Sequence, residues 1–205
     1  MFLAIVGIPG IGKTSICERL SSLTGAEFFG EPKRSEWPAF IDEFFEDHAF
    51  EVLMWFRVYQ FVAIKNCKLA SNNGLAITDA YYHKFLSEYI DSPNSEWIIS
   101  KTDPYFGAFR EVINTDQAVL PNADAIVNLI AQESTWREMV RSRQGTRDDT
   151  LLDHAFGTQK DITEAARSFS NRCDIPFLLI DQKLNCIDAT VNDILRFLDG
   201  IPHGT

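Results

Sequence analysis

The sequence predicts an α/β fold of three layers, α/β/α, in which helices cover both faces of a five-stranded parallel sheet. Short apolar runs that end in a turn or an acidic residue indicate buried strands, and longer segments with helical spacing separate them. Because these segments are long enough for crossover helices, neighbouring strands should run parallel. The expected strands are residues 2–6, 26–29, 75–77, 125–130 and 176–180. The expected helices are residues 13–23, 51–70, 80–90, 133–143 and 187–198.

Three polar or flexible positions lie within two residues of the ends of the first three expected strands. Gly7 follows the first strand, Glu31 the second and Asp79 the third. In parallel α/β sheets ligands bind at the carboxyl ends of the strands. We therefore expect the topology to bring these positions together at one edge of the sheet.

The composition limits the domain count and the kinds of partner. A length of 205 residues suits one domain, residues 1–205, and a net charge of -10 argues against a surface for duplex nucleic acid. A small-molecule partner is favoured. The four cysteines form no C-x-x-C pair, which fits reduced thiols and predicts a cytoplasmic protein. Charged residues interrupt the apolar segment 48–70, so we expect no membrane span.

The segment between the first expected strand and helix matches the spacing G-x-x-x-x-G-K-[ST] in full. Glycines let successive backbone N–H groups curl around an anion, and the helix start adds its positive dipole end. This predicts a P-loop for ATP, with Lys13 reaching the β- and γ-phosphates and the Thr14 hydroxyl holding Mg²⁺. A chance glycine turn is the alternative. The expected nucleotide-binding residues are Gly7, Ile8, Pro9, Gly10, Ile11, Gly12, Lys13, Thr14 and Ser15.

Asp79 ends the buried run 75–78. P-loop enzymes commonly place an acidic residue at such a position, near the metal or the acceptor. Asp79 is therefore a candidate catalytic residue and, with Thr14, a candidate Mg²⁺ ligand. The alternative is a turn aspartate that caps a helix starting at Ala80.

In order and approximate spacing, nearly the whole chain resembles the deoxyribonucleoside kinase family and, more distantly, the thymidylate kinases that share its fold. Glu31-Pro32 followed by Trp37 resembles the segment E-P-x-x-x-W, with the Trp one residue further away. The resemblance implies a P-loop kinase fold, Glu31 as base toward the acceptor's 5′-hydroxyl, and Trp37 packed against the nucleobase. A strand-end carboxylate suits that proton transfer independently of the family. The alternative is a Glu-Pro turn and a core aromatic.

Arg57 stands where the family would have a Gln that reads the base edge with paired hydrogen bonds. Because Arg offers only donors, the resemblance implies a base that presents acceptors, either guanine-like or thymine/uracil-like. The alternative is that Arg57 pairs with a carboxylate on a neighbouring helix, as a buried arginine must.

Residues 78–83 resemble the D-R-S or D-R-Y motif, with Ala80 in place of the arginine that usually contacts phosphate. Tyr82 is a candidate substrate contact, together with its neighbours Tyr81 and His83. The alternative is that these residues only pack at the start of a helix.

Four arginines fall within eleven residues of this acidic chain. They resemble the arginine-rich lid that closes over the donor phosphates, here around residues 137–149. The resemblance implies that Arg137 and Arg141 bind the donor and that Arg141 and Arg143 neutralise the transferring group. The fourth is Arg147. The alternative is a solvated face paired with Glu133, Glu138, Asp148 and Asp149.

These features together predict phosphoryl transfer from ATP to a nucleoside. One alternative is a nucleoside monophosphate kinase of the thymidylate type, favoured by Arg57 and residues 79–83. A kinase acting on a hydroxylated base in DNA is another, and a nucleotide-binding regulator without transfer activity is a third, motivated by Ala80 and the shifted Trp37. By the same resemblance, the helix in 48–70 is a candidate homodimer face, with burial against the chain's own sheet as the alternative.

Overall fold

A computed structural model describes residues 1–41, 48–144 and 149–201, with the backbone alone for 143–144 and 149–153. Within these residues five strands form one sheet, in the order β2-β3-β1-β4-β5. Every neighbouring pair of strands is parallel, as predicted. The strands are β1 (Phe2–Val6), β2 (Glu27–Phe29), β3 (Ala76–Thr78), β4 (Ala125–Ile130) and β5 (Phe177–Asp181).

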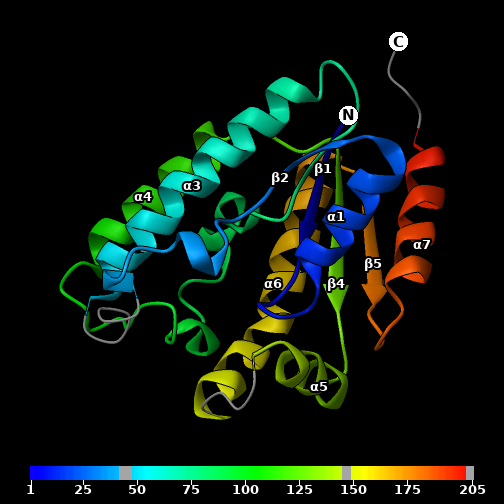
Figure 1. Cartoon of the computed structure of the whole chain (residues 1–205). Coiled ribbons are helices and arrows are strands. Elements are labelled where there is room, and N and C mark those ends of the chain that lie inside the picture. Colours follow the sequence, from blue (N-terminus) through cyan, green and yellow to red (C-terminus); the bar gives the residue numbers. More distant parts are fainter. Residues whose placement is uncertain (42–47, 145–148, 202–205) are drawn as a thin grey trace.

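Helices cover both faces of this sheet, which confirms the three-layer prediction (Figure 1). In Figure 1, α1 and α7 lie together on one side, and α3 and α4 lie on the other. The helix α5 lies near the end of the sheet toward which β4 points. The helices are α1 (Lys13–Thr24), α3 (Ala49–Ala70), α4 (Phe106–Val119), α5 (Glu133–Gln144), α6 (Asp149–Cys173) and α7 (Ile187–Asp199).

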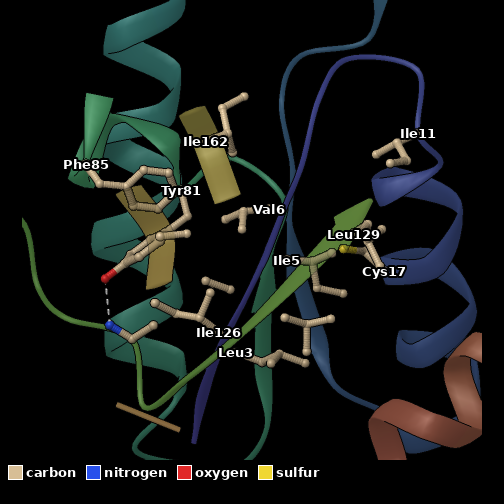
Figure 2. Close-up of a cluster of buried hydrophobic side chains, with 14 of the residues drawn as sticks. Leu3, Ile5, Val6, Ile11, Cys17, Tyr81, Phe85, Ile126, Leu129 and Ile162 are labelled. Carbon is tan, nitrogen blue, oxygen red and sulfur yellow. Dashed lines mark hydrogen bonds between the residues drawn. The ribbon is translucent and has the colours of Figure 1, made fainter. Parts of the chain in front are cut away.

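The central strand β1 is buried along its whole length. Successive side chains of a strand point to opposite faces, so β1 contributes to the core on both sides of the sheet. Figure 2 shows Ile5 toward Cys17 of α1, and Val6 on the side of Ile162 from α6. The carboxyl end of β1, which leads into the glycine loop, is thus held between two packed layers.

The helix α3 has one buried face and one exposed apolar face. It buries Ala63, Ile64 and Cys67, while Val62 and Leu69 remain 50% and 67% exposed. Burial against the chain's own sheet, the alternative considered for this segment, is therefore present, and an apolar stripe remains on the opposite face. No helix within the described parts of the chain is long and apolar enough to cross a membrane.

The predicted helix over residues 80–90 is wrong. The segment forms short 3₁₀ turns, Tyr82–Lys84 and Leu86–Glu88. Four successive residues, from His83 to Leu86, are buried, and one face of an α-helix cannot bury four residues in a row. Lys84 is drawn inward as well, because its ammonium donates to the Gln117 and Leu120 carbonyls near the end of α4.

Tyr81 anchors this irregular segment to the loop before β4. Its side chain is fully buried, and its hydroxyl accepts from the Ala123 N–H at 2.8 Å, the bond drawn in Figure 2. The same hydroxyl donates to the Pro121 carbonyl at 3.3 Å. Tyr81 therefore serves packing, the alternative considered for it.

We predict that Tyr81→Phe lowers the free energy of unfolding by about 1–3 kcal/mol, since the buried Ala123 N–H loses its acceptor. Urea unfolding followed by circular dichroism measures the loss. Tyr105→Phe is the matched control, because Tyr105 is 50% exposed and should change stability by less than about 0.5 kcal/mol. Equal effects of the two substitutions would contradict this role of the hydroxyl.

Candidate active site

The loop between β1 and α1 has a backbone that only glycine adopts easily. Gly7 and Gly12 have φ angles of 146° and 96°, which L side chains rarely adopt. A Cβ added to Gly7 would lie 2.7 Å from the Leu129 carbonyl oxygen. Ile8 and Ile11 are fully buried and fix the loop to the core. The loop is therefore rigidly placed at the carboxyl end of β1.

Lys13, the first residue of α1, reaches back over this loop. Its ammonium donates to the carbonyl oxygens of Gly7 at 3.0 Å and Ile8 at 3.2 Å. These contacts hold a positive charge beside the loop and at the N-terminus of α1, where the helix dipole also favours an anion. The arrangement is suited to bind phosphate groups.

Asp79 joins this loop to the segment after β2. Its Oδ2 accepts from the Thr14 hydroxyl at 2.6 Å, and its Oδ1 accepts from the Glu31 backbone N–H at 3.2 Å. The carboxylate is 2% exposed. No α-helix begins at Ala80 in the described chain, so the alternative of a helix cap does not apply. Asp79 therefore lies between the phosphate loop and Glu31.

The oxygens of Thr14 and Asp79 fit a magnesium ion. Mg²⁺ prefers oxygen ligands and is usually held by one or two protein groups together with substrate phosphates and water. A hydroxyl and a carboxylate that already lie 2.6 Å apart supply such a pair. Among the described residues no cluster of three or more His, Cys, Asp or Glu could hold a metal by itself, so phosphate would have to complete the coordination.

Glu31 lies beside a buried amide. The Gln60 side-chain N–H group donates to Glu31 Oε1 at 2.9 Å and also bonds the Tyr82 hydroxyl. Gln60 Oε1 has no hydrogen-bond partner within the described residues, although the side chain is fully buried. Glu31, Gln60 and Tyr82 thus form a connected polar group from the segment after β2, from α3 and from the segment after β3.

The pKa of Glu31 is raised above its ordinary value. The main cause is partial loss of hydration, because protein atoms crowd the carboxyl on one side, while Glu31 as a whole is an exposed residue. The negative charge of Asp79 raises the pKa further, while Lys13 and the hydrogen bond from Gln60 act in the opposite direction. A carboxylate with a raised pKa is better matched to taking a proton near neutral pH.

Arg57 forms a bidentate ion pair with a carboxylate on α4, a helix of the same layer. Its Nε and Nη2 donate to the two oxygens of Asp116 on α4, at 2.7 Å and 2.6 Å. This is the alternative considered for Arg57, pairing with a carboxylate on a neighbouring helix. His83 lies 3.7 Å from the same carboxylate, and burial, with the charge of Arg57, lowers the pKa of His83 to about 3. His83 is therefore neutral, and among the described residues Arg57 is the cation that balances Asp116.

Gln60 was not selected from the sequence as a site residue. It lies one helical turn after Arg57, so both residues share one face of α3. Arg57 turns to Asp116, while Gln60 turns to Glu31. The sequence does contain a signal for Gln60, because its neutral amide interrupts the apolar stretch that continues to Ile64. A buried amide without an evident partner often marks a ligand or a polar network.

Trp37 lies in an aromatic cluster at the N-terminal part of α3. Its indole N–H donates to the Pro32 carbonyl at 3.0 Å, and its ring meets the rings of Phe56 and Trp55 at centroid distances of 5.0 Å and 6.5 Å. The side chain is only partly buried. Trp37 thus packs against α3 and still presents part of its surface.

The predicted lid arginines belong to α5 and the segment after it. Arg137 donates from Nε and Nη2 to Glu133, at 2.9 Å and 2.7 Å, in agreement with the alternative of pairing along the helix. Arg141, one turn later, is exposed. The side chain of Arg143 and the whole of Arg147 lie outside the described residues.

Comparison with solved structures identifies the fold. Three structures of deoxyadenosine kinase from M. mycoides match with TM-scores of 0.69, 0.66 and 0.65, at 22%, 20% and 19% identity. The matches cover 97–98% of this chain and 98–100% of the kinase chains. The first contains the products dCMP and a flexible dCDP, the second dATP and the third dCTP. No protein-family model and no curated protein matches the sequence. The chain therefore has the P-loop fold of the deoxyribonucleoside kinases.

We predict that Arg57→Met lowers the free energy of unfolding by about 3–5 kcal/mol, because it leaves the buried Asp116 carboxylate unpaired. The double variant Arg57→Met with Asp116→Leu should recover a large part of this loss, since no buried charge remains. Urea unfolding measures both. Arg110→Met is the control, because the Arg110–Asp91 pair is half-exposed and should contribute less than about 1 kcal/mol. A double variant no more stable than Arg57→Met would contradict the pairing.

Proposed function

We propose that this protein transfers the terminal phosphoryl group of ATP to the 5′-hydroxyl of a nucleoside. The observation that carries the proposal is the Asp79 carboxylate, which bonds the Thr14 hydroxyl through one oxygen and the Glu31 backbone through the other. The group that faces the donor phosphates and the group that faces the acceptor are therefore neighbours of one buried side chain. Such closeness is what in-line transfer between two bound substrates requires.

On the donor side, the residues from Gly7 to Ser15 bind the triphosphate. When the triphosphate binds, the Lys13 ammonium leaves the loop carbonyl oxygens that it bonds in this structure and contacts the β- and γ-phosphates. Thr14 and Asp79 would hold Mg²⁺, and the ion would neutralise charge on the phosphates. Arg137 and Arg141 of α5, with Arg143, add positive charge around the transferring group.

On the acceptor side, Glu31 takes the proton of the 5′-hydroxyl. The hydroxyl oxygen forms a bond to the γ-phosphorus, the bond from that phosphorus to the bridging oxygen breaks, and ADP leaves. The hydrogen bond from Gln60 orients the Glu31 carboxylate for this step. Tyr82 and Trp37 line the space that the nucleoside occupies.

The resemblance to deoxyadenosine kinases supports a nucleoside as acceptor, because those proteins share the fold over their whole length. The preference for guanine or thymine/uracil that Arg57 implied now has less support, since two of its donors are used by Asp116. Gln60 has the unpartnered acceptor on this helix face and takes over base reading in our proposal. Its Oε1 accepts an N–H from the base.

The experiment that tests the proposal is a transfer screen with labelled ATP and Mg²⁺. We expect label on one or more of the four deoxynucleosides and none on their monophosphates or on oligonucleotides. The relative rates on the four bases assign the base preference. Label on monophosphates alone would identify the thymidylate-type alternative, and ATP binding without transfer to any acceptor would identify a regulator.

We predict that Glu31→Gln lowers kcat by about 10²–10⁴-fold, because the amide cannot accept the proton. The Kd for ATP should stay within about twofold, since the substitution leaves the phosphate loop unchanged. Steady-state kinetics and calorimetry measure the two quantities. Glu27→Gln is the control, because Glu27 is an exposed residue of β2, the strand that precedes Glu31, and should leave kcat unaltered. An unaltered kcat in Glu31→Gln would exclude Glu31 as the base.

The raised pKa of Glu31 gives a second prediction. The base must be unprotonated, so kcat/KM should fall as the pH drops through that pKa, at a higher pH than for an ordinary glutamate. Gln60→Ala removes a hydrogen bond that lowers the pKa of Glu31, so the acid limb should move to still higher pH. A pH–rate profile of kcat/KM tests this. A limb that stays in place or moves to lower pH would show that Gln60 does not act on Glu31.

A further inference from the structure

The helix α5 lies directly against the phosphate loop. Figure 1 shows it close to the loop that leads into α1. The Trp136 indole N–H donates to the Pro9 carbonyl at 2.8 Å, and the side chain is only 1% exposed. Val140, one helical turn later, is also buried. Neither residue belongs to the eight-residue loop motif or to the arginines of α5.

A second contact joins the same two elements. Gly10 has a φ of +80°, and a Cβ added to it would lie 2.6 Å from Val140 Cγ2 and 3.5 Å from Trp136 Nε1. The loop backbone and α5 are therefore packed so closely that a methyl group does not fit between them. Gly10 is required here for its positive φ and also for the approach of the helix.

The hydrogen bond from Trp136 orients a peptide group of the loop. All described peptide bonds are trans, and a trans peptide places its C=O and N–H on opposite sides. Because the Pro9 carbonyl points to α5, the Gly10 N–H points away from α5. A phosphate-binding loop needs this orientation, with carbonyls outward and N–H groups toward the anion.

Trp136 also packs against α6. Its ring packs on Phe156 of α6 at a centroid distance of 5.5 Å. Gln159 of the same helix bonds both the N–H and the carbonyl of Ala131, just before α5, at 2.9 Å and 3.0 Å. The start of α5 is thus fixed to α6. Because Trp136 packs on α6 and bonds the loop, the loop has a fixed position relative to both helices.

We propose that Trp136 is a positioning residue for the donor triphosphate. Its N–H holds the peptide between Pro9 and Gly10 in the anion-binding orientation, and it sets the distance from the loop to Arg137 and Arg141 on the same helix. This role rests on the proposed function only in taking the ligand to be a triphosphate. It assigns no chemical step to Trp136.

The first test compares Trp136→Phe with the wild type by calorimetry, using Mg²⁺–ATP and inorganic triphosphate as separate probes. We expect the Kd for both to rise roughly fivefold to tenfold, as for one lost hydrogen bond, with the KM for the nucleoside unchanged. Trp97→Phe is the matched control, because the Trp97 indole nitrogen has no hydrogen-bond partner within the described residues. Equal affinities in Trp136→Phe and the wild type would overturn the proposal.

The second test is a double-mutant cycle on Gly10 and Val140, which keeps the question open to refutation even if Trp136→Phe does not fold. Gly10→Ala should weaken triphosphate binding by more than tenfold, because its methyl group meets Val140. Adding Val140→Ala removes the obstructing methyl and should restore binding at least threefold. Strictly additive effects would mean that α5 does not control the loop.

The two proposals fail in different ways. A wild-type protein that binds triphosphate but phosphorylates no nucleoside contradicts the proposed function, while the effect of Trp136→Phe on binding still stands. A wild-type protein that binds neither probe overturns both. Normal transfer with no loss of affinity in Trp136→Phe overturns only the role of Trp136.

Discussion

The arrangement of the site depends on one buried carboxylate, that of Asp79. The strand β3 lies between β1 and β2 in the sheet, so the residue that follows it lies between the phosphate loop and Glu31. Both oxygens of Asp79 are used there, one by the Thr14 hydroxyl and one by the Glu31 backbone. A buried charge is tolerated when it is hydrogen-bonded in this way. The sheet order therefore supplies the geometry that the chemistry needs.

Two carboxylates of the site region differ in what their surroundings allow. Asp116 accepts from both arms of the Arg57 guanidinium and is fully buried, so it acts as a fixed partner of Arg57. The Glu31 carboxylate accepts an amide N–H from Gln60 and, among the described residues, forms no ion pair, and its pKa is raised. A carboxylate without a bound cation can gain and lose a proton at modest cost. The difference separates a structural acid from one suited to proton transfer.

Much of the fold could be predicted because its signals are local. Each strand consists mainly of apolar residues, as expected for a parallel sheet covered on both faces, and the five predicted strands agree with the structure within about a residue. The helices α4 and α6 were not predicted. The buried face of α6 combines Ile162 and Phe169 with small residues such as Ala155, Ala165 and Ala166. The buried face of α4 includes a charged residue, Asp116, beside Phe109 and Ile113.

The parts of the candidate site that could be predicted are those whose residues lie close together in the sequence. The loop from Gly7 to Thr14 carries its own signature, whereas the contacts of Asp79 span 48 and 65 residues and no local pattern records them. The same holds for the face of α3 that carries Arg57 and Gln60. Periodicity places both side chains on that face, but it cannot say which one turns to Glu31. Asp116, which lies 59 residues after Arg57 in the chain, determines that Arg57 turns away from Glu31. Since its two oxygens fit a guanidinium fork and not a single amide, Arg57 is drawn to α4, and the amide of Gln60 is left to face Glu31.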